Sequence, residues 1–169
     1  RLDFGAVEID QPPARIMEQL MAMQPAGIIM EFREELTEPV SSLGRPVVVA
    51  LADMLMEGIG CVNVDDFAVG RLAADYLWEK GLRHFGFYGF ESLHAPGRKT
   101  GFLEGLRNRG ADAALCEFDE QARPARRLDQ LDKWLAALAR PAGVFAAHDP
   151  LAREIVERCA RLGLRVPAE

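Results

Sequence analysis

Polar and aromatic side chains follow the apolar runs of this sequence, and their types suit the binding of a small polar molecule. They are a guanidinium, an imidazole, a phenyl ring and four carboxylates: Arg98, His148, Phe90, Asp53, Asp65, Glu91 and Asp149. A guanidinium is a planar fork of donors that suits paired hydroxyls or a carboxylate. An aromatic ring beside carboxylates and an arginine is the composition expected of a carbohydrate pocket.

Several of these residues also have a structural alternative. Arg98 lies near the predicted start of a helix, where its charge opposes the macrodipole and requires an anionic or hydroxyl-rich partner. That partner is either a ligand or a neighbouring carboxylate, Glu91 or Glu104. His148 either contacts a ligand or is an exposed loop side chain. Asp149, which precedes a proline, suits a helix N-cap at least as well as a ligand contact.

The adjacent carboxylates Asp65 and Asp66 raise the possibility of general acid–base chemistry. Side chains at adjacent strand positions point in opposite directions, which makes a cooperating pair difficult to form. Asp66 is placed well to cap the helix that follows, and we favour this interpretation.

No nucleotide-binding or catalytic motif is found in the sequence. It contains neither GxxxxGK[ST] nor a GxGxxG that follows a strand, and it has no GxSxG. The histidines His84, His94 and His148 do not have the spacing of metal ligands. We therefore expect no cofactor, no metal site and no enzymatic activity.

The elements that must position the candidate residues alternate between strand and helix. Apolar runs of strand type cover residues 4–9, 26–32, 46–51, 61–64, 85–90, 115–119 and 143–147. Helical patterns lie between most of them, and two of these patterns end at Gly81 and Gly163. Such alternation predicts parallel strands with right-handed crossovers. Ligands bind beyond the carboxyl ends of the strands in these sheets, where the candidate residues are expected to converge.

The composition limits the partners of this chain. Its 169 residues carry a net charge of −6, which argues against DNA contact by this segment, because phosphate binding needs a basic face. No apolar run approaches the ~20 residues of a membrane span, and from these residues we expect no signal peptide. The isolated cysteines Cys61, Cys116 and Cys159 are expected to be buried thiols in a reducing cytoplasm. The chain starts without Met and within a predicted strand, so we expect an incomplete fragment of a domain.

Three motifs occur in a familiar order: VNVDDFAVGRLAADYL with KGLRHFGFYGF, then GRKTGFLEGL, then GVFAAHDPLAREI. Together they resemble the effector-binding domain of lactose-repressor-family transcription regulators, a fold shared with periplasmic sugar-binding proteins. Within the family, FYGFES and the segment after it are most similar to xylose operon regulators.

The resemblance implies an α/β fold of the periplasmic-binding-protein-like type I, with two Rossmann-like parallel-sheet lobes. Residues 1–63 would be part of the N-terminal lobe and residues 64–169 part of the C-terminal lobe. Arg98 stands in GRKTGF where the family has the arginine that hydrogen-bonds sugar hydroxyls. The pair His148–Asp149 stands where many members have Asn-Asp, so the histidine departs from the family pattern.

The function implied is that of a cytoplasmic sugar sensor. A pentose such as xylose would bind between the lobes, and DNA would be bound through a domain absent from this chain. The protein would form a homodimer without membrane contact. A periplasmic sugar-binding protein of a transporter is the main alternative, and an enzyme of flavodoxin-like or sugar-isomerase type is disfavoured.

Overall fold

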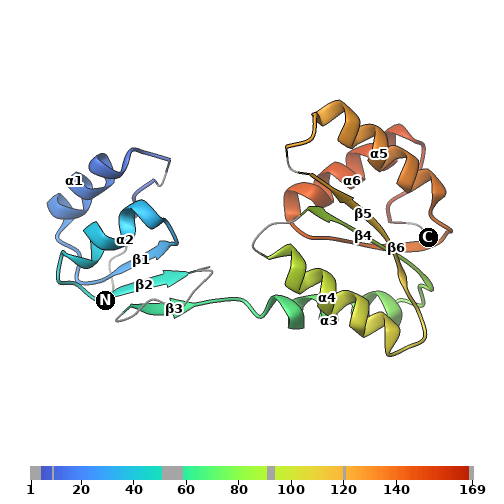
Figure 1. Ribbon diagram of the computed structural model, residues 1–169, viewed down its shortest axis with the longest axis horizontal. Coiled ribbons are helices and arrows are strands. Elements are labelled where there is room, and N and C mark those ends of the chain that lie inside the picture. The colour runs from blue at the N-terminus through green and yellow to red at the C-terminus, as the bar shows by residue number, and fades with distance from the viewer. Residues whose placement is uncertain (1–4, 9, 51–58, 91–93, 120, 168–169) are drawn as a thin grey trace. The chain divides into compact units, whose positions relative to one another are not determined.

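The computed structural model describes residues 5–8, 10–50, 59–90, 94–119 and 121–167, and it divides the chain into two compact units (Figure 1). Unit 1 is Arg1–Val64 and unit 2 is Asp65–Glu169. Each unit has its own parallel sheet, which confirms the predicted α/β fold. The assignment of the two units to two lobes stays a prediction. In the described part of the chain, no helix has the length and apolar character needed to cross a bilayer.

Unit 1 is a three-stranded sheet with two helices. The strands β1 (Ile28–Glu31), β2 (Val47–Ala50) and β3 (Gly60–Val62) pair in that order, and the helices are α1 (Pro13–Met23) and α2 (Glu34–Ser41). The buried cluster beneath the helices consists of Ile16, Ile28, Leu36 and Val40. The strand predicted over residues 4–9 is not found in its described part, residues 5–8. Val7 packs against this cluster, and residues 5–8 are not paired with β1, β2 or β3.

Unit 2 is a second three-stranded parallel sheet with helices on both faces. Its elements are α3 (Asp66–Glu79), β4 (His84–Phe90), α4 (Ala95–Arg107), β5 (Ala113–Phe118), α5 (Pro124–Ala137), β6 (Ala142–Ala146) and α6 (Asp149–Arg161). Helices α3 and α4 cover one face of the sheet and α5 and α6 the other (Figure 1). Apolar side chains from both layers fill the core, and the largest that are fully buried include Phe87, Tyr88, Phe102, Leu106 and Leu131.

The strand order β5-β4-β6 fixes where a ligand can approach unit 2. The chain runs from β4 to β5 on one side and then crosses to β6 on the other side of β4. Strands whose connections leave in opposite directions create a crevice beyond their carboxyl ends, and this is where ligands bind in open α/β sheets. The crevice of unit 2 therefore lies beyond the ends of β4 and β6.

A row of glycines brings α3 and α4 unusually close together. An added Cβ at Gly101 of α4 would lie 2.0 Å from the carbonyl oxygen of Phe67, and one at Gly70 of α3 would lie 2.0 Å from that of Arg98. Gly97 and Gly105 extend the row one turn to either side, where an added Cβ would meet α3 side chains at 2.9 and 2.8 Å. Because no side chain separates the two backbones, the beginning of α3 lies against the beginning of α4.

Candidate functional site

Asp66 is the centre of a polar cluster beyond the carboxyl ends of β4 and β6. Its Oδ1 accepts a hydrogen bond from Nε of Arg98 at 2.8 Å, and its Oδ2 lies 2.7 Å from Nδ1 of His94. The three side chains are between 17% and 20% exposed, so the ion pair is largely shielded from water. An ionised carboxylate only accepts hydrogen bonds, and His94 therefore carries its proton on Nδ1. In the neutral ring, Nε2 is then an acceptor.

The assignment of Asp66 as the N-cap of α3 was wrong by one residue. The N-cap is Asp65, whose carboxylate accepts a hydrogen bond from the backbone N–H of Ala68 at 2.9 Å. Asp66 is the next residue and lies within the first turn, where the tight α3–α4 contact places its carboxylate against α4. Adjacent aspartates thus have different tasks, and Asp65, a predicted ligand contact, caps the helix.

Arg98 joins three elements of the crevice. It lies in the first turn of α4, bonds to Asp66 on α3, and donates from Nη1 to the carbonyl oxygen of Ala147 at 2.6 Å. Ala147 directly follows β6 and is held by a 2.9 Å hydrogen bond from its N–H to the carbonyl of Tyr88 on β4. The sequence suggested Glu91 or Glu104 as the alternative ion-pair partner. Glu91 lies outside the described residues, and the described ion-pair partner of Arg98 is Asp66. The guanidinium is thereby fixed at the switch point of the sheet, the place beside β4 where the strand order reverses between β5 and β6.

Aromatic rings complete one side of the cluster. The centroid of the Phe90 ring, at the end of β4, lies 5.7 Å from that of His148, and His148 lies 6.5 Å from His94 in an edge-on arrangement. Burial lowers the pKa of His148, and the neighbouring charge of Arg98 lowers it further. A neutral imidazole is therefore the favoured form of His148 near neutral pH.

The remaining predicted site residues divide into two groups. Asp149 begins α6, but the N-cap position is His148 and no side-chain cap hydrogen bond is formed there, so the predicted capping role of Asp149 is wrong. The helix starts at Asp149, one residue earlier than a cap at Asp149 would require. Asp53 and Glu91 lie outside the described residues.

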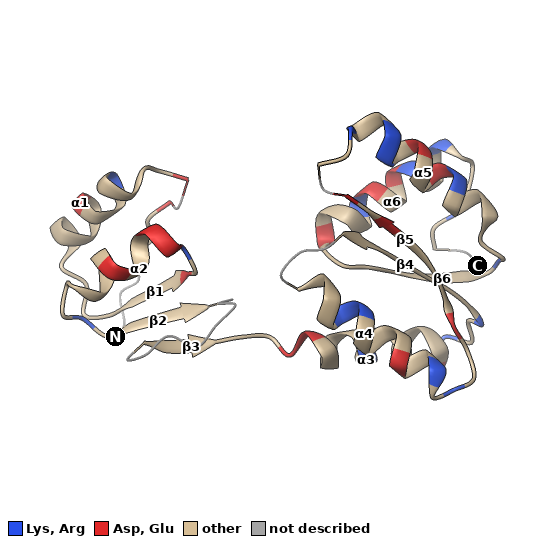
Figure 2. Cartoon of the chain, in the orientation of Figure 1, with Lys and Arg blue, Asp and Glu red and all other residues tan. Residues whose placement is uncertain are grey.

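Sequence reasoning missed Asp66 and His94 as members of the site. His94 was considered only as a metal ligand. In the described part of the chain, no group of three or more His, Cys, Asp or Glu side chains is arranged to hold a metal ion. Figure 2 shows acidic residues where α3 begins and basic residues in the first turns of α4, and this charge pairing across two helices is the available signal.

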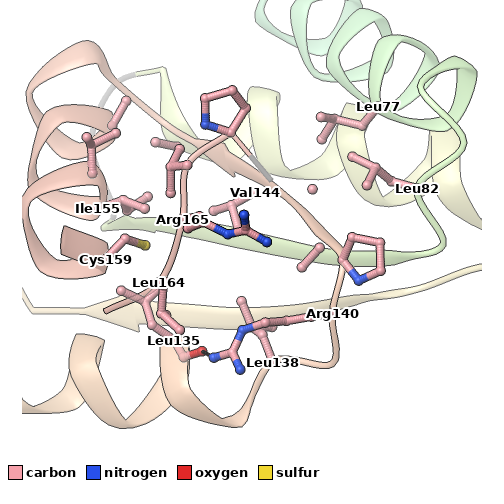
Figure 3. Close-up of a pocket in the computed structure, with 18 of the residues that line it drawn as sticks. Leu77, Leu82, Leu135, Leu138, Arg140, Val144, Ile155, Cys159, Leu164 and Arg165 are labelled. Carbon is pink, nitrogen blue, oxygen red and sulfur yellow. Dashed lines mark hydrogen bonds between the residues drawn. The ribbon is translucent and has the colours of Figure 1, made fainter. Parts of the chain in front are cut away.

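An apolar cavity of about 620 Å³ lies along β6 (Figure 3). Its lining includes Leu82, Leu138, Val144, Ile155 and Cys159. None of the polar side chains at the switch point lines it. An apolar cavity offers few partners for hydroxyl groups, so the polar cluster is the better candidate for a ligand site.

Comparison with known proteins identifies the family. Residues 74–169, more than half of the chain, match the periplasmic binding protein-like domain. The chain belongs to this family. One solved structure that resembles this chain is a periplasmic binding protein/LacI transcriptional regulator from Alkaliphilus metalliredigens, complexed with D-xylulofuranose. That structure has a TM-score of 0.62 at 23% identity, over 90% of this chain and 57% of the other. The transcription regulator GntR from Chromobacterium violaceum has a TM-score of 0.60 at 25% identity, over 91% and 59%.

Curated relatives of this periplasmic binding protein-like chain are regulators by name. Catabolite control protein A of Staphylococcus xylosus is 27% identical over 94% of this chain and 50% of its own length. The xylose operon regulatory protein of Haemophilus influenzae is 29% identical over 64% of this chain and 30% of its own length. The chain spans at most about half the length of the curated relatives it matches.

Proposed function

We propose that this chain is the effector-binding part of a DNA-binding transcription regulator, and that its effector is a sugar, a pentose such as xylose being the leading candidate. The observation that carries the proposal is the position of Arg98, fixed at the switch point between β4 and β6 by Asp66 and by the carbonyl of Ala147. A planar donor fork held in a parallel-sheet crevice suits the paired hydroxyls of a monosaccharide. Phe90 and His148 add flat surfaces on which a sugar ring can pack.

The relatives support regulation over transport. All four curated relatives are named as control or regulatory proteins, and one of them is a xylose operon regulator. We propose that DNA is contacted by a part of the protein outside this acidic chain, that the protein forms a homodimer, and that it works in the cytoplasm. Cell fractionation separates this proposal from a periplasmic sugar-binding protein, because a transport component would be recovered from the periplasm.

The proposal also explains physically how sugar binding could change regulation. A sugar changes regulation only if it binds two arrangements of the protein with different affinity. The two compact units correspond in this proposal to the two lobes of the sensor. Turnover of the sugar by the protein would instead indicate an enzyme and would contradict the proposal.

Isothermal titration of the protein expressed from its complete gene against a panel of neutral monosaccharides tests the function. Binding of at least one sugar is expected, and replacement of Arg98 by Ala should weaken it by roughly 100-fold or more, as for the loss of a charged group's hydrogen bonds. Arg109→Ala is the matched control, because Arg109 pairs with Asp75 at 2.8 Å and lies outside the cluster. Unchanged sugar affinity in Arg98→Ala would remove Arg98 from the site.

A further inference from the structure

Asp66 determines more than the position of Arg98, because it also sets the net charge of the cluster. Arg98 is its permanent cation, and Asp66 contacts that cation directly through Nε at 2.8 Å. Both side chains are about four-fifths buried, which limits the screening of this ion pair by water. A second anion placed against Arg98 would therefore have to share the guanidinium with Asp66 and would be repelled by it.

The hydrogen bonds of Arg98 are compatible with the same selectivity. The described residues supply no further partner to Nη2 of Arg98. A hydroxyl oxygen can accept from this donor without bringing a negative charge next to Asp66, whereas a carboxylate or phosphate oxygen would bring one.

We propose that Asp66 is a specificity-determining residue that makes this site select uncharged polyhydroxylated ligands and reject their anionic counterparts, such as aldonates and sugar phosphates. This inference rests on the proposed sugar-binding function and extends it to the charge of the ligand. Sequence reasoning left the ligand of Arg98 open between sugar hydroxyls and a carboxylate. The carboxylate that Arg98 binds is supplied by the protein itself.

The experiment compares ligands that share a shape and differ in charge. D-glucose and D-glucuronate, which are both pyranose rings, form one pair, and xylitol and D-xylonate, which are both open chains, form another. Titration calorimetry of the complete gene product should give tighter binding of the neutral member, by at least about tenfold for one unit charge at this range and shielding. In Asp66→Asn, which keeps the shape of the side chain and removes its charge, this ratio should shift toward the anion by about tenfold.

Asp75→Asn is the matched control. It lies on the same helix, also pairs with an arginine, and changes the net charge by the same amount, but its partner Arg109 is outside the cluster. The ratio of neutral to anionic affinity should stay at the wild-type value in this variant. An equal shift in Asp66→Asn and Asp75→Asn would show a general charge effect and would overturn the assignment to Asp66.

The possible failures can be told apart. If no neutral or anionic sugar binds to the wild type or to either variant, the proposed function is wrong and this inference falls with it. If the wild type binds the anion as tightly as the neutral sugar or more tightly, sugar binding stands and the selectivity is wrong. The wild-type ratio requires no variant, so it decides the question even if Asp66→Asn does not fold. A folded Asp66→Asn with the wild-type ratio also contradicts the inference.

Discussion

The close contact between α3 and α4 predicts that a single methyl group will destabilise unit 2. Replacement of Gly101 by Ala would place a Cβ 2.0 Å from the carbonyl oxygen of Phe67 and 2.8 Å from its carbonyl carbon. These are backbone atoms of a helix, so no side-chain rotation can relieve the overlap. The two helices must separate by about 1 Å or more to restore ordinary van der Waals contact.

Two opposing effects set the size of this change. Overpacking a well-packed contact costs typically ~1–3 kcal/mol, and the backbone overlap places Gly101→Ala at the upper end. Alanine in a helix interior is favoured over glycine by ~1 kcal/mol, which offsets part of that cost. The expected net loss is about 2 kcal/mol in the free energy of unfolding, or ~10 °C in Tm for a unit of this size.

Urea and thermal denaturation followed by circular dichroism measure this loss. Thr100→Ala is the control, since Thr100 is an exposed neighbour in the same helix and its replacement raises helix propensity without adding atoms between the helices. The control should keep the wild-type stability to within about 0.5 kcal/mol. Gly101→Ala as stable as the wild type, or more so, would mean that helix propensity outweighs packing and that α3 and α4 are not in backbone contact.

Three further variants change polar groups that are buried or partly buried in unit 2. The pKa of His148 is lowered, mainly by burial and then by Arg98, so the unfolded chain binds a proton more readily than the folded one. The contribution of His148 to the free energy of unfolding is complete above pH 6.5, the usual pKa of histidine. It is lost as the pH falls from there through the lower pKa of the folded state. In His148→Gln, the free energy of unfolding should therefore depend less steeply on pH over this range. Tyr88→Phe removes the hydroxyl that donates to Glu154 at 2.8 Å and should cost about 1 kcal/mol, because Arg127 still pairs with Glu154. Glu154→Ala should cost more, about 2–3 kcal/mol, because it leaves both Tyr88 and Arg127 without this partner; equal losses in denaturation would contradict this order.

The alternation of apolar runs and helical patterns predicted the parallel α/β class, although the strand expected over residues 4–9 is not found in residues 5–8. The run 85–90 lies within β4, and α3 ends at Glu79, with Gly81 just after the C-cap Lys80 in the left-handed region at φ 81°. Parallel pairing followed from the alternation alone. Periodicity succeeds here because burial of an apolar face decides local structure in both the helices and the central strands.

The sequence placed Arg98, Phe90 and His148 near one another but did not predict the contacts that Arg98 makes. Arg98, Phe90 and His148 come together because strand ends converge in a parallel sheet, and this follows from topology. The exchange of roles between Asp65 and Asp66 could not be predicted, since either carboxylate can cap a helix and helix ends are uncertain by one or two residues in sequence. A shift of one residue is sufficient to turn a capping side chain into an ion-pair partner.

The partner of Arg98 shows why local reasoning stops short of the site. A cation in the first turn of α4 opposes the helix macrodipole, and this predicted an anionic or hydroxyl-rich partner without identifying it. The anion is Asp66, 32 residues earlier in the chain, and it reaches Arg98 only because Gly70, Gly97 and Gly101 let the two helices meet. Gly97 and Gly101 are four residues apart in α4, and this spacing can be read from the sequence. The sequence does not show which helix this glycine face contacts. The compensation is therefore part of the folded protein before any ligand arrives, and a ligand has to match a neutralised pair rather than a free positive charge.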